Sequence, residues 1–217
     1  MGRTYISERL IPEQTLLQYM TFHELVELLK FNQCVFAQAG SAQHKTLLRT
    51  ASRLRRQRPP QADAALPAPP AAPSRLKRHI ALQWWGPAGG RAQAAPLPHD
   101  RQAPQIGVLS TVQALCNALS LGDHDLYISE TSGGQAGATR DIAVFCMFAD
   151  VRPAAGEDEW RLLADIRELL TGIVLPPDAP PRFQELVRKV VQEHLWIPVR
   201  TLPGEAFGNG AGRAPCG

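Results

Sequence analysis

The sequence predicts an α+β fold: a small mixed or antiparallel sheet covered by four to five helices, with a central disordered segment rich in Pro, Ala and Arg. Apolar residues recur at helical spacing in several stretches, and short apolar runs of strand length stand between them. Residues 59–104 hold ten Pro and twelve Ala among 46 residues. Such a segment has too few large apolar side chains to offset the entropy lost on ordering.

The N-terminal part is predicted to be largely helical. Thr21-Phe22-His23-Glu24 has the pattern of a capping box, in which each end residue accepts the backbone N–H of the other. An Arg-rich helix further on must end before Pro59, because proline cannot continue a helix. The elements expected here are a short helix at 12–19, a helix at 22–31, a strand at 34–37 and a helix at 43–58.

The C-terminal part alternates strand and helix patterns. The apolar run at 142–148 has the length of a buried strand, and it pairs as a hairpin with the run at 126–128. The helix that opens at Pro181 uses proline where the missing N–H costs nothing. The other elements expected here are a helix at 112–119, a helix at 160–170 and an edge strand at 195–199.

These elements suggest four regions. They are an N-terminal helical segment (1–58), a basic Pro/Ala-rich linker (59–104), an α+β core (105–202) and a disordered tail (203–217). Whether the first and third regions share one core stays open. Within the linker, an island at 75–85 ends in two adjacent tryptophans, and we expect both to be exposed in the isolated protein.

The charge distribution is the most informative feature of the sequence. Residues 44–101 carry eleven basic and two acidic side chains, whereas the rest of the chain carries 12 basic and 18 acidic ones. Clustered Lys and Arg can neutralise phosphates, and tryptophan can stack on bases. A solvated linker lying against the acidic body is the alternative. The residues predicted to bind a polyanion or a partner are Arg53, Arg55, Arg56, Arg58, Arg75, Lys77, Arg78, Trp84 and Trp85.

Three functions follow from these patterns. The first is a non-catalytic regulatory protein of the bacterial cytosol that uses the basic Trp-containing segment to contact a protein partner. The second is a nucleic-acid-associated protein, with nuclease or other hydrolase activity as an option. The third is a hydrolase or transferase with carboxylates beside strand 142–148, drawn from Glu130, Asp141, Asp150 and Glu157.

Familiar catalytic motifs are missing from the sequence. It contains no Gly-rich loop ending in Lys-Ser or Lys-Thr, no His-Glu-x-x-His and no Gly-x-Ser-x-Gly. Three of the four cysteines lie in apolar runs, where a thiol behaves as a small hydrophobe. We therefore expect no cofactor and no metal. No apolar stretch is long enough for a membrane helix, and the N-terminus has no secretory pattern, so a cytosolic protein without a membrane partner is expected.

Overall fold

The computed structural model describes residues 2–57, 78–87, 105–120, 122, 124–131, 141–149 and 159–201. Ten strands join into one mixed sheet, in the order β1-β6-β7-β4-β2-β5-β9-β10, with β3 paired to β4 and to β8. The strands are β1 (Thr4–Ile6), β2 (Thr15–Met20), β3 (Gln33–Gln38), β4 (Arg78–Pro87), β5 (Ile106–Thr111), β6 (Asp125–Glu130), β7 (Ile142–Ala149), β8 (Glu159–Leu163), β9 (Gly172–Leu175) and β10 (Val199–Thr201). The helices are α1 (Phe22–Phe31), α2 (Ser41–Gln57), α3 (Val112–Ala118), α4 (Ile166–Leu169) and α5 (Pro181–His194).

The predicted fold class, a small sheet covered by four to five helices, is wrong in the proportion of strand to helix. The sheet is large, and helices do not cover it as a small sheet would be covered. Most of the region expected to be a short helix at 12–19 is strand β2 (Thr15–Met20), which pairs in register with β5. The region expected to be a helix at 160–170 is strand β8 followed by the short helix α4. Both errors have one cause: apolar residues that also fit a helical spacing are placed by long-range strand pairing.

Several predicted elements are confirmed. Helix α1 has the expected capping box at Thr21 and Glu24, and α5 opens with Pro181. The apolar run of β7 pairs antiparallel with β6, as the predicted hairpin requires. The edge strand expected at 195–199 lies further along the chain, as β10 at Val199–Thr201, which pairs in parallel with β9 and shares one residue with the predicted range.

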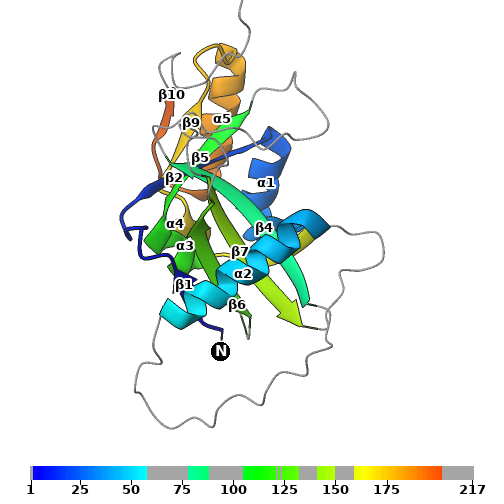
Figure 1. Cartoon of the computed structure of the whole chain (residues 1–217). Helices are drawn as coiled ribbons and strands as arrows, with labels where there is room; N and C mark the ends of the chain where they lie inside the picture. The colour runs from blue at the N-terminus through cyan, green and yellow to red at the C-terminus, as the bar shows by residue number, and fades with distance from the viewer. Residues whose placement is uncertain are drawn as a thin grey trace, which may run out of the picture.

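Two layers of apolar side chains lie on the two faces of the sheet. Helix α2 crosses one face over β4, β7 and β6, as Figure 1 shows. It packs Leu47, Ala51 and Leu54 against side chains of that face that include Tyr127 and Phe145. The larger cluster lies on the other face and combines residues of α1, α3, α4 and α5 with β2, β5 and β9.

The island in the Pro/Ala-rich segment is a strand of this sheet. Strand β4 pairs antiparallel with β7 from Arg78 to Trp85. The prediction that residues 59–104 form a linker is therefore wrong for 78–87. The rest of the predicted linker, at 59–77 and 88–104, lies outside the described part of the chain. The assigned tail at 203–217 also lies outside it.

Candidate active site

The sheet forks beside β4. One edge of β4 is paired with β7 along its length. On the opposite edge, β3 pairs with Ala81 and Leu82, whereas β2 pairs with Gly86 and Pro87. The two neighbours therefore diverge between Leu82 and Gly86, and helix α1 connects β2 to β3 across the opening.

A cavity of about 650 Å³ lies in this fork, which we call the fork cleft. The size is that of a small-molecule site, for which about 300–1,000 Å³ is usual. Residues of β2, α1, β3 and β4 supply most of the lining, and the mouth adds Thr131, Asp141 and Glu159. The polar and aromatic lining residues include Gln18, Tyr19, Glu24, Gln33, Cys34, Gln83, Trp84 and Trp85.

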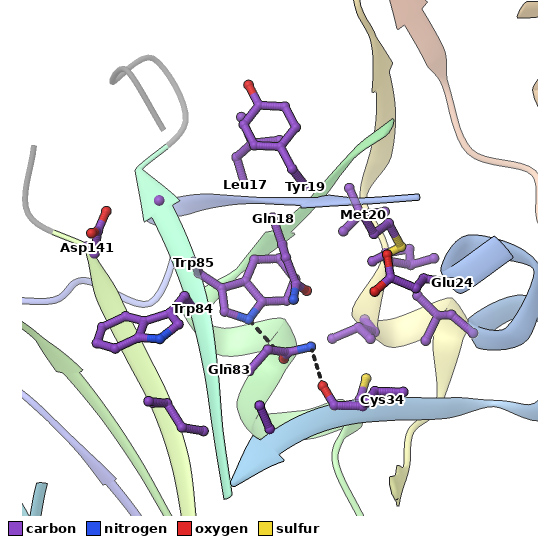
Figure 2. A pocket seen from close by; sticks show the side chains of 18 of the residues that line it. Leu17, Gln18, Tyr19, Met20, Glu24, Cys34, Gln83, Trp84, Trp85 and Asp141 are labelled. Atoms are coloured by element: carbon purple, nitrogen blue, oxygen red, sulfur yellow. Dashed lines mark hydrogen bonds between the residues drawn. The ribbon is translucent and has the colours of Figure 1, made fainter. Parts of the chain in front are cut away.

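The two tryptophans point to opposite sides of β4, because successive side chains of a strand alternate. Trp85 lies toward Gln18 and is 2% exposed, whereas Trp84 lies toward Asp141 and is partly buried (Figure 2). The prediction that both tryptophans are exposed is wrong, because Trp84 is partly buried and Trp85 is buried. Its position in the wall of a cleft makes it a candidate contact for a small ligand.

Gln83 fixes the geometry of the fork. Its side-chain Oε1 accepts a hydrogen bond from Trp85 Nε1 at 3.1 Å, and its Nε2 donates to the backbone carbonyl of Val35 at 3.3 Å. Figure 2 shows both bonds as a chain from the indole to β3. The amide thus links β4 to β3 just beyond the point where their backbone pairing ends.

The charged side chains among the described lining residues are all carboxylates: Glu24, Asp141 and Glu159. Glu24 is held by the capping box, where its Oε2 accepts from Thr21 N–H at 2.6 Å. Asp141 is fixed through its backbone, since its carbonyl accepts from Thr131 N–H and Thr131 Oγ1. Burial raises the pKa of the Asp141 carboxyl above its ordinary value. Glu159 is exposed at the start of β8, in register with Ala37.

Cys34 also lines the cleft, but it is not a candidate nucleophile. Burial raises the pKa of its thiol to about 12. Since the thiolate is the reactive form, a thiol with that pKa is inert near neutrality. Within the described part of the chain, no group of three or more His, Cys, Asp or Glu side chains could hold a metal ion. No described helix is long and apolar enough to cross a membrane.

The predicted basic residues on α2 do not line the cleft. Arg53, Arg55 and Arg56 are on α2. Arg55 donates to Asp125 Oδ2 at 2.8 Å and lies over the rings of Tyr5 and Tyr127, so it is engaged in the fold. Arg78 belongs to β4. The predicted residues Arg58, Arg75 and Lys77 lie outside the described residues.

The predicted function as a non-catalytic regulatory protein is wrong, as is the emphasis on protein–protein interaction through an exposed Trp-containing segment. That segment is a paired strand in the sheet, and its Trp85 is buried. Burial of Trp85 argues against stacking of both rings on bases, whereas binding of nucleic acid by the basic residues stays a prediction. Of the carboxylates expected beside strand 142–148, Asp141 lines the cleft, whereas Asp150 and Glu157 lie outside the described residues.

Comparisons with known proteins give one weak likeness. No protein-family model and no curated protein sequence matches the chain. Among solved structures, Thermus sp. 2.9 DarT in complex with NAD+ is similar at 10% identity and a TM-score of 0.45, over 92% of this chain and 100% of that chain. The same protein in complex with ADP-ribosylated ssDNA gives 12% identity and a TM-score of 0.45, over 96% and 100%. Likeness at this level assigns no function.

Proposed function

We propose that the protein is an enzyme whose substrate places a planar, positively charged aromatic group in the fork cleft. The observation that carries this proposal is the chemistry of the lining: its described charged side chains are carboxylates, and Tyr19, Trp84 and Trp85 line the same cleft. Aromatic faces attract cations, and the attraction grows when water is excluded. An anionic group in the position of that ring is disfavoured by the carboxylates.

The reaction that suits this arrangement is substitution at the carbon attached to the ring. The bond from that carbon to the ring nitrogen breaks, its electron pair stays on the nitrogen, and the ring leaves neutral. An oxygen nucleophile then bonds to the carbon and loses its proton. Carboxylates stabilise the positive charge that develops on such a carbon and can accept the nucleophile's proton.

The surroundings of Glu159 and Asp141 indicate which of them accepts the proton and which stabilises the positive charge. Glu159 is exposed at the mouth, where an incoming nucleophile arrives, and we assign it the acceptance of the proton. Asp141 is partly buried beside Trp84, and we assign it the stabilisation of the positive charge. Glu24 is bound within its helix cap and takes no part in this proposal.

NAD+ is the first substrate to test. It is the ligand named for one of the DarT structures. Its nicotinamide ring is planar and cationic and is joined to a sugar carbon, which is the bond that the proposal requires. NADH is the matched comparison, because its ring is uncharged while the rest of the molecule is the same. We expect NAD+ to bind at least about tenfold more tightly than NADH in calorimetry, a difference of about 1.4 kcal/mol.

The activity test is release of the free ring from NAD+, followed by chromatography. Glu159→Gln should lower the rate by about 100-fold or more, the usual contribution of a general base. Glu185→Gln, on the exposed face of α5, is the matched control and should leave the rate unchanged. Equal binding of NAD+ and NADH together with no ring release would overturn the proposal.

A further inference from the structure

Helix α2 carries an exposed row of basic side chains on the face opposite its core contacts. Lys45, Arg49, Arg53 and Arg56 are all exposed. At 100° per residue they fall within one narrow arc of the helix. The residues that α2 buries, Leu47, Ala51 and Leu54, lie on the opposite side.

These cations have no counter-charge in the described part of the chain. Helix α2 contains no Asp or Glu. No ion pair or hydrogen bond joins the four side chains to any described residue, in contrast to neighbouring Arg55, which binds Asp125. The helix dipole explains a basic residue such as Arg56 in the last turn, but not Lys45 and Arg49 further back.

We propose that this basic row binds the phosphate backbone of a nucleic acid strand. The row spans twelve residues, from Lys45 to Arg56, and eleven rises of 1.5 Å make it about 16 Å long. About five phosphates of one strand occupy that length, at about 3.4 Å along the axis for each. Three of the four side chains are arginines, whose planar guanidinium pairs with a phosphate through two parallel bonds.

The structure favours a nucleic acid over a membrane surface. A helix that binds a membrane inserts its apolar face between lipids. The apolar face of α2 is already buried against the sheet, so the exposed side offers charge without an apolar anchor. A shallow groove along this side is lined by Arg49, Ser52, Arg53 and Arg56 together with Leu48 and Gln57. The proposal does not depend on which ligand occupies the fork cleft.

The test is fluorescence anisotropy with a labelled 15-nucleotide single strand at a series of salt concentrations. The variant is the triple change Arg49→Gln, Arg53→Gln and Arg56→Gln, which keeps good helix formers and spares Arg55. Loss of three phosphate contacts should make the slope of log K against log salt less steep by about 2. Affinity at low salt should fall by at least about tenfold.

A matched control removes the same charge elsewhere. Arg182→Gln, Lys189→Gln and Arg200→Gln change three exposed cations of α5 and β10. This control should keep the parental slope. An equal loss in both triple variants would attribute binding to net charge alone and would overturn the proposal. Parental binding by the α2 variant would overturn it too, as would tighter binding of polyglutamate than of the strand.

Discussion

At the scale of single residues, Gln83 links two strands that diverge at the fork cleft. Its amide joins Trp85 to a backbone carbonyl 48 residues away in the chain. No local pattern marks such a residue, because its partner is brought close by the sheet. The same reasoning applies to Glu159, which the sequence placed before a helix, whereas it begins a strand at the cleft.

Gln83→Leu should lower the free energy of unfolding by about 1–3 kcal/mol. Leucine has nearly the same size but leaves Trp85 Nε1 and the Val35 carbonyl without partners in a buried site. Urea unfolding measures the change, and Gln192→Leu on the exposed side of α5 is the control. A loss below about 0.5 kcal/mol would show that water replaces both bonds.

At the scale of elements, one wrong prediction concerns a strand whose alternating burial also fits a helical spacing. Strand β8 has the pattern exposed, buried, exposed, buried, exposed, with Trp160 and Leu162 inside. The helical spacing of Trp160, Leu163 and Ile166 concealed this alternation, and Leu163 is in fact 56% exposed. Helices with local signals were predictable, because a capping box or an initial proline acts within one turn of the chain.

Helix α1 gives an element-scale prediction. It joins the two strands that border the fork cleft, and its N-terminus is fixed by Thr21 Oγ1, which accepts from Glu24 N–H at 3.3 Å. Thr21→Ala should cost about 1 kcal/mol of stability, whereas Thr21→Ser should cost little. Thermal unfolding of both variants checks the difference. Equal midpoints for Ala and Ser would show that the hydroxyl does not cap the helix.

At the scale of the whole molecule, the sheet was the hardest feature to predict. Its central strand β4 comes from a segment whose composition indicates disorder, and its order follows pairings far apart in sequence. The charge distribution is visible in the sequence, but the sequence does not distinguish Lys45, Arg49, Arg53 and Arg56, which pair with no described residue, from Arg55. Only the position of Asp125 beside Arg55 separates them.

Stability should fall in alkaline solution. Burial raises the pKa of Cys34 and Cys146 to about 12 and that of Cys116 to about 11. The unfolded thiols lose their protons near pH 8.5, so the unfolded state binds fewer protons above that value and is favoured as pH rises. The stability should be fully present below about pH 8 and decline toward pH 11. Each thiol contributes up to about 1.4 kcal/mol per pH unit.

Urea unfolding at pH 7, 9 and 10.5 checks this decline. Cys34→Ala combined with Cys146→Ala should make the dependence on pH shallower, whatever it costs in stability at pH 7. A parental protein equally stable at pH 7 and 10.5 would contradict the assignment of these thiols as buried and protonated.

The parallel pairing of β1 with β6 also determines when β1 can join the sheet during synthesis. Thr4 is in register with Leu126, about 120 residues later in the chain. During synthesis at about 5–20 residues per second, the first strand waits roughly 6–25 s before its partner has been made. Contacts of such long sequence separation also slow folding after release. The N-terminal strand therefore cannot pair with β6 until more than half of the chain has been made.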